Sequence, residues 1–282
     1  MTSYVFPGQG SQKVGMGSEL FEKFPEYIKQ ANDILGYNAA QLCLENPDNK
    51  LGNTAYTQPL LYLVSTLEYL NTKDEENIKP TFFAGHSLGE YAALFAANVF
   101  DFKTGLQLVQ KRGELMSQAS GGGMAAVIGM SGENIQDLIT TQHLTAIQVA
   151  NFNEPNQTVI SGEKEAILAA KQQFEEAGAR RYIPLPVSGA FHSKFMEDAK
   201  DKFATYIENF TFSEPTIPVI ANVTAKPYVQ ENIKTLLIDQ IVSSVQWVKS
   251  IQYIINQNET DFKEIGPGSV LTGLIAKIKR HS

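Results

Sequence analysis

Hydrophobic residues along the chain follow two patterns, and each pattern predicts a different element. Runs of consecutive apolar residues predict short buried strands at 4–6, 81–84 and 217–223. Apolar residues repeated at intervals of three and four predict helices over 19–35 and 101–119. Strands and helices therefore follow one another along the chain, as in an α/β protein.

Proline and charge mark further boundaries. Pro59 lies near the start of an apolar stretch at 57–67, so we expect a helix there with the proline near its first turn. The charged stretch 73–79 is expected to be a surface loop. The last part of the chain is expected to form a helix at 248–256, a strand at 262–265 and a final helix from about 269.

The middle of the chain predicts a separate unit. The glycines at 121–123 mark a break, after which strands and helices follow in the order β-α-β-β-α-β, which is the ferredoxin-like pattern. The strands are expected at 124–130, 146–150, 157–161 and 180–185, and the helices at 133–140 and 164–177. We therefore expect an inserted ferredoxin-like subdomain at 121–186, and a catalytic subdomain made of 1–120 and 187–282.

Composition narrows the class of protein. With 282 residues, 43% of them hydrophobic and 19% charged, the chain can build a sizeable core. Its net charge of −7 argues against nucleic acid or an anionic membrane as the main partner. The single cysteine, Cys43, lies between two leucines and is expected to be a core residue. No metal-ligand spacing, signal peptide or bilayer-length apolar run is found, so we expect a cytoplasmic protein without a metal.

Residues 85–89, Gly-His-Ser-Leu-Gly, carry the strongest chemical signal. They follow a predicted strand and precede a helix-forming stretch, which is the strand–turn–helix context of a nucleophile elbow. Such a turn strains the backbone of Ser87 and packs closely at both flanks, where glycines are needed. It presents the Ser87 hydroxyl above the sheet edge and aims the N–H of Leu88 at an incoming carbonyl oxygen.

A second donor for that oxygen must come from another loop. The turn after the first strand contains Gly8 and Gly10, but the third glycine of a dinucleotide-binding fingerprint would fall at Lys13. The turn is therefore expected to bring a backbone N–H close to a bound group, and Gln9 is well placed to supply it.

The helix after the elbow carries a charge on its apolar face. Arg112 lies between Val109 and Met116 in the apolar stripe of 101–119. A buried arginine keeps its charge and needs an anion. That anion can be a structural Asp or Glu, or a carboxylate of the substrate.

Ser87 needs a general base, and histidine is the usual one near neutral pH. His86 adjoins the serine and points elsewhere, His143 belongs to the inserted unit, and His281 is next to the C-terminus. His192 remains, in a small-residue loop that returns to the main subdomain. Glu264 can complete a triad, and a backbone carbonyl can also hold the imidazole tautomer.

Five stretches of the chain form a set of motifs, at 6–12, 85–91, 110–113, 191–193 and 266–268. With these motifs the chain resembles, over nearly its whole length, the malonyl-CoA:acyl-carrier-protein transacylases, the acyltransferase family of fatty acid and polyketide synthesis. The resemblance implies an α/β-hydrolase-like core with a parallel sheet and an inserted ferredoxin-like subdomain.

The resemblance also implies roles for individual residues. These are Ser87 as nucleophile, His192 as base, the N–H groups of Gln9 and Leu88 as oxyanion donors, Arg112, Phe191 and His86 at the substrate, and the main-chain carbonyl of Gln240 as the group that orients the histidine. Arg112 would pair with the malonyl carboxylate, and Phe191 would narrow the pocket against an α-methyl branch.

The implied substrates are malonyl-CoA and a phosphopantetheinylated acyl carrier protein, with no bound cofactor and a monomeric enzyme. The chain ends about a dozen residues after Gly268, which resembles free-standing acyltransferases that serve polyketide synthases in trans. Two alternatives stay open. A thioester hydrolase would use the same Ser87 and His192 without needing Arg112, and an inactive docking module would need none of them.

Overall fold

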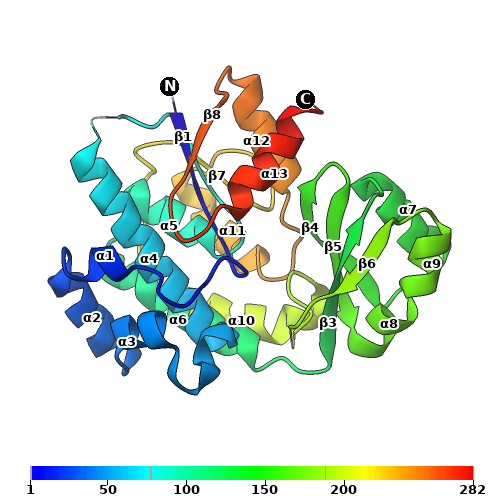
Figure 1. Cartoon of the computed structure of the whole chain (residues 1–282), viewed down its shortest axis with the longest axis horizontal. Helices are drawn as coiled ribbons and strands as arrows, with labels where there is room; N and C mark the ends of the chain where they lie inside the picture. Colours follow the sequence, from blue (N-terminus) through cyan, green and yellow to red (C-terminus); the bar gives the residue numbers. More distant parts are fainter. Residues whose placement is uncertain (1, 77, 188, 282) are drawn as a thin grey trace.

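The computed structural model describes residues 2–76, 78–187 and 189–281. Its body is built on a parallel sheet with the strand order β7-β2-β1-β8 (Figure 1). The strands are β1 (Thr2–Phe6), β2 (Phe83–Gly85), β7 (Val219–Ile220) and β8 (Asp261–Glu264). The first strand therefore lies in the middle of the sheet, between two strands that are far from it in sequence.

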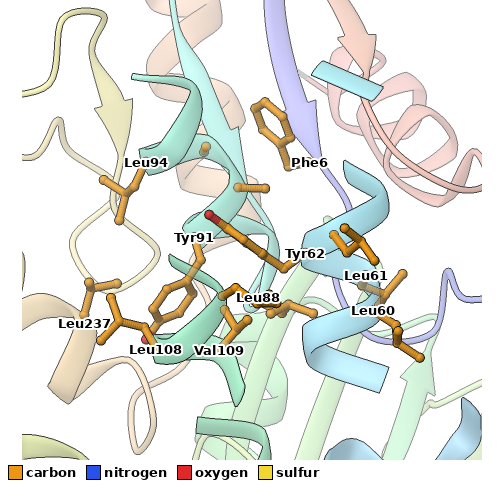
Figure 2. Close-up of a cluster of buried hydrophobic side chains, with 14 of the residues drawn as sticks. Phe6, Leu60, Leu61, Tyr62, Leu88, Tyr91, Leu94, Leu108, Val109 and Leu237 are labelled. Carbon is orange, nitrogen blue, oxygen red and sulfur yellow. The ribbon is translucent and has the colours of Figure 1, made fainter. Parts of the chain in front are cut away.

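Both faces of β1, β2 and β7 are buried, which explains the apolar runs at these strands, whereas the edge strand β8 is charged and partly exposed. Phe6 and Phe83 point into the larger core, whereas Val5 and Ala84 point into a second core on the other face. The larger core is covered by α4 (Thr54–Glu75), α5 (Gly89–Ala96) and α6 (Phe102–Ser117), and the second by α12 (Trp247–Asn256) and α13 (Val270–Lys279). Figure 2 shows the side chains of the larger core meeting between these helices.

Further helices surround the larger core. They are α1 (Ser18–Phe21), α2 (Pro25–Leu35), α3 (Ala39–Glu45), α10 (Glu197–Ile207) and α11 (Ile233–Asp239), with short 3₁₀ turns η1 (Pro47–Gly52), η2 (Lys194–Met196) and η3 (Gln230–Asn232). Cys43 is a free, buried member of the core, as predicted. Within the described residues, no helix is long and apolar enough to cross a membrane.

The middle of the chain forms a separate antiparallel sheet with the order β4-β5-β3-β6 (Figure 1). Its strands are β3 (Gly122–Ile128), β4 (Ile147–Glu154), β5 (Gln157–Glu163) and β6 (Arg181–Pro184), and its helices are α7 (Gly132–Thr141), α8 (Lys164–Ala169) and α9 (Lys171–Glu176). The predicted β-α-β-β-α-β order is confirmed, except that the helix expected at 164–177 is divided into α8 and α9. Apolar side chains between this sheet and its helices form a core of their own.

Several predicted boundaries were wrong, and each has a local cause. The helix expected over 19–35 is divided before Pro25, because proline has no N–H to donate and is accommodated at the first helical position. The helix expected from 57 begins at Thr54, where Asn53 accepts a hydrogen bond from the Ala55 N–H, so Pro59 lies in its second turn. The same helix continues to Glu75, through part of the expected 73–79 loop.

Candidate active site

Ser87 lies in the sharp turn between β2 and α5 with a φ of 51°, a conformation that is strained for a residue with a side chain. Two side chains hold this backbone. The Ser87 N–H donates to Asn222 Oδ1 at 2.7 Å, and the Ser87 carbonyl accepts from Gln240 Nε2 at 2.9 Å. The strain therefore persists because contacts on both sides of the residue fix it.

The glycines that flank Ser87 are required by packing. A Cβ at Gly85 would lie 2.0 Å from the Gly89 carbonyl carbon, and one at Gly89 would lie 2.1 Å from the Phe6 oxygen. Real Cβ atoms do not approach backbone atoms so closely. The prediction that both flanks need residues without a side chain is confirmed.

His192 follows the antiparallel sheet in the sequence, whereas Ser87 precedes it, and the fold brings the two side chains together. Its Nε2 lies 2.8 Å from Ser87 Oγ, and its Nδ1 lies 2.8 Å from the main-chain oxygen of Gln240. Because that oxygen can only accept, Nδ1 carries the proton and Nε2 is free to accept one from Ser87. Burial, followed by the charge of Arg112, lowers the pKa of His192 to about 3, so the ring is neutral near neutral pH.

The other candidates for base and acid are elsewhere. Glu264 is not a triad member, because its carboxylate accepts from the Leu271 and Thr272 N–H groups at the start of α13. His143 and His281 are both exposed and do not line the cavity at Ser87.

Arg112 is fully buried beside Ser87. Its Nη1 donates to Gln58 Oε1 at 2.7 Å, and its Nη2 donates to Gln240 Oε1 at 2.8 Å and to Ser87 Oγ at 3.2 Å. Its Nε has no hydrogen-bond partner, and no ion pair to Arg112 occurs among the described residues. The alternative that a structural Asp or Glu pairs directly with this arginine is therefore not realised.

Two backbone N–H groups remain for an oxyanion. Those of Gln9 and Leu88 donate no hydrogen bond to any residue that the structure describes, and both residues line the cavity that contains Ser87. The turn that carries Gln9 packs tightly on the elbow, since a Cβ at Gly8 would lie 2.4 Å from the His86 oxygen. The two N–H groups can thus serve one developing charge.

The cavity has a volume of about 190 Å³. Besides the residues above, its walls contain side chains from both sheets and their loops: Gln58, His86, Met116, Met124, Asn151, Asn153, Val159, Leu185, Val187 and Phe191. His86 Nε2 lies 2.8 Å from Asn153 Oδ1, and Phe191 is buried at the wall. This volume is below the range of pockets for larger ligands, so it suits a short acyl group.

Some residues of the site were not found by sequence analysis. Gln58, Asn222 and Asn153 are amides without a motif of their own, and only the fold brings them to the elbow. Glu90 is part of the stretch 85–91, yet no role was assigned to it. Within the described residues, no group of three or more His, Cys, Asp and Glu side chains could hold a metal ion.

A serine on a strained turn, a neutral histidine and free N–H donors around a small cavity are typical of enzymes that form an acyl-serine ester. A family model described as the acyl transferase domain matches residues 3–280, so the chain belongs to this family. The polyketide biosynthesis malonyl CoA-acyl carrier protein transacylase PksC of Bacillus subtilis (strain 168) is 54% identical over 283 residues, covering 100% of the chain and 98% of the relative.

Solved structures agree with this assignment. A malonyl CoA-acyl carrier protein transacylase from Burkholderia pseudomallei is 44% identical with a TM-score of 0.95, and the match covers 100% of the chain and 99% of the neighbour. A malonyl-transacylase in complex with its type II polyketide synthase acyl carrier protein is 39% identical with a TM-score of 0.94, covering 99% and 93%. The comparisons give no support to a thioester hydrolase.

Proposed function

We propose that the protein transfers a malonyl group from coenzyme A to the phosphopantetheine thiol of an acyl carrier protein, in fatty acid or polyketide synthesis. The observation that carries this proposal is the buried Arg112, which pairs with no carboxylate in the described part of the chain and lines the same cavity as Ser87 and His192. A hydrolase or a docking module gains nothing from a buried cation that is not paired directly with a carboxylate.

In the proposed reaction, His192 Nε2 takes the proton of Ser87 Oγ, and Oγ attacks the thioester carbonyl carbon. The N–H groups of Gln9 and Leu88 stabilise the oxyanion, and Arg112 binds the malonyl carboxylate with two hydrogen bonds. The intermediate collapses to malonyl-Ser87 as the thiolate of coenzyme A leaves with the proton from His192. The carrier thiol then gives its proton to His192 and attacks the ester, and Ser87 Oγ leaves with the proton returned from His192.

In this proposal the remaining residues orient the catalytic groups and shape the acyl pocket. The main-chain oxygen of Gln240 orients His192, while Phe191 and His86 shape the space for the acyl group. We also propose that 1–120 and 187–282 form the catalytic subdomain and that 121–186 form an inserted one. We infer that the enzyme acts as a monomer without a bound cofactor, because one chain supplies every group used above. We also infer a cytoplasmic location.

Intact mass spectrometry after incubation with malonyl-CoA tests the proposal. We expect one malonyl adduct, its absence in Ser87→Ala, its presence in the matched surface variant Ser213→Ala, and its transfer to added carrier protein. Turnover of malonyl-CoA to the free acid without transfer would indicate a hydrolase. A folded protein that is never modified would indicate a docking module.

A further inference from the structure

Glu90 is a buried carboxylate that the proposed reaction does not use. It lies in the first turn of α5, three residues after Ser87, and its exposed fraction is 0%. Its Oε1 accepts from the Asn222 N–H at 2.7 Å, and its Oε2 accepts from the Gln240 side-chain amide. Both partners are donors, so both carboxylate oxygens must act as acceptors.

The Gln240 amide is fixed in one orientation by its neighbours. Its Nε2 donates to Glu90 and to the Ser87 carbonyl, and its Oε1 accepts from Arg112 Nη2 at 2.8 Å. A carboxylate and a carbonyl only accept, and a guanidinium only donates. If the amide were reversed, its oxygen would face two acceptors and its NH₂ group would face the cation.

We propose that Glu90 is a positioning residue that fixes the orientation of the Gln240 amide and thereby holds Arg112 beside Ser87, ready for a carboxylated acyl group. The inference rests on the proposed function, since it assigns Arg112 to the acyl carboxylate. Through the Asn222 main chain, the same carboxylate also supports the side chain that accepts from the Ser87 N–H.

The indirect contact has an electrostatic purpose. A buried guanidinium is costly unless a negative charge compensates it, but a direct ion pair would occupy the N–H groups that the substrate needs. Burial lowers the pKa of Arg112, and Tyr91 and then Glu90 oppose this effect, Glu90 supplying its charge from the far side of Gln240. The guanidinium thus stays charged in the wall of the cavity, beside Ser87 Oγ.

The network requires the ionised form of Glu90. A protonated carboxyl would turn an O–H group toward Asn222 or Gln240, both of which already donate. Burial raises the pKa of Glu90 to about 7, against the lowering effects of Asn222, Tyr228, Gln240 and Arg112 around it. As the pH falls through this range, Glu90 takes up a proton and the orientation of the amide is lost.

The variant Glu90→Gln keeps the shape and removes the charge. The NH₂ group of the new glutamine would face the N–H donor of Asn222 or Gln240. If the Gln240 amide reversed to accept from it, the Gln240 NH₂ group would face the Arg112 guanidinium. The matched control is Glu259→Gln, a buried glutamate near the start of β8, at the opposite end of the parallel sheet. The readout is the ratio of the Ser87 loading rates with malonyl-CoA and acetyl-CoA, because steps common to both substrates cancel.

We expect Glu90→Gln to lower the malonyl:acetyl ratio about tenfold or more, and Glu259→Gln to leave it unchanged. A folded Glu90→Gln with the wild-type ratio would overturn the inference while leaving the proposed function intact. A wild-type protein that takes no malonyl group would overturn both.

If Glu90→Gln does not fold, the unmodified enzyme decides the question between pH 5.5 and 8.5. The free carboxyl of malonyl-CoA, with an ordinary pKa of about 4, stays ionised in this range. A malonyl:acetyl ratio that falls below about pH 7 supports the inference. A constant ratio across the range overturns it.

Discussion

Arg112→Ala is the sharpest test of how the site selects its acyl group. The substitution removes the cation that opens on the cavity and leaves the oxygens of Gln58 and Gln240 without their donor. A malonyl group would then bring a carboxylate into a buried site that has nothing to pair with it. An acetyl group carries no such charge and would lose only the weaker contact between Arg112 and Ser87 Oγ at 3.2 Å.

The size of the effect follows from these contacts. An uncompensated buried charge costs about 3–5 kcal/mol, which is roughly 10²–10⁴ in kcat/KM for malonyl loading. Loss of one long hydrogen bond from a charged donor costs about 1.5 kcal/mol, so acetyl loading should fall by about tenfold. The malonyl:acetyl ratio of kcat/KM should therefore drop by at least about tenfold.

The assay is the initial rate of Ser87 acylation over a range of each coenzyme A ester. Lys111→Ala is the matched control, because Lys111 lies next to Arg112 on α6 but pairs with Glu114 at the surface. It should leave both rates unchanged. Equal losses for malonyl and acetyl in a folded Arg112→Ala would refute the assignment.

Three further predictions concern the base, the elbow and the cavity wall. His192→Ala should slow loading by about 10²–10⁴-fold, whereas the exposed His143→Ala should not change it; normal loading by the first variant would exclude this base. Gly89→Ala should lower the free energy of unfolding, measured in urea, by about 3 kcal/mol or more, because the new Cβ would meet backbone atoms. The control Gly273→Ala should raise it by about 0.5–1 kcal/mol, because a Cβ at this helical position has no described atom within 4 Å. Phe191→Ala should raise the methylmalonyl:malonyl loading ratio about tenfold, and an unchanged ratio would show that this ring does not exclude the branch.

The parts of the site that sequence analysis found are those with a local signature. The elbow is defined by five consecutive residues, because its backbone geometry demands glycines on both sides of Ser87. His192 was found by elimination, since the chain has only four histidines. The strands β1, β2 and β7 were found because both of their faces are buried, which favours short apolar runs in the sequence.

The parts that were missed depend on approach in three dimensions. Gln58 and Asn222 are ordinary amides in sequence, and no spacing distinguishes them from surface residues. The group that holds His192 is a main-chain oxygen, which has no residue type to signal it. Glu264 is the last residue of a strand, a place where a triad acid can lie, but its carboxylate caps α13 instead.

The chain enters the antiparallel sheet through β3 and leaves it through β6, and these two strands are neighbours. Ala125 pairs with Pro184, and the Leu185 N–H donates to the Met124 oxygen at 2.9 Å, so the first and last strands of this sheet run side by side. Because the two ends of the sheet are close together, the folded sheet joins the two parts of the catalytic subdomain as a short loop would. Lengthening its outer loops therefore adds little to the entropic cost of bringing Ser87 and His192 together. The exceptions are the parts of β3, β4 and β5 that line the cavity with Met124, Asn151, Asn153 and Val159, so insertions are tolerated at the outer rim and excluded at the wall.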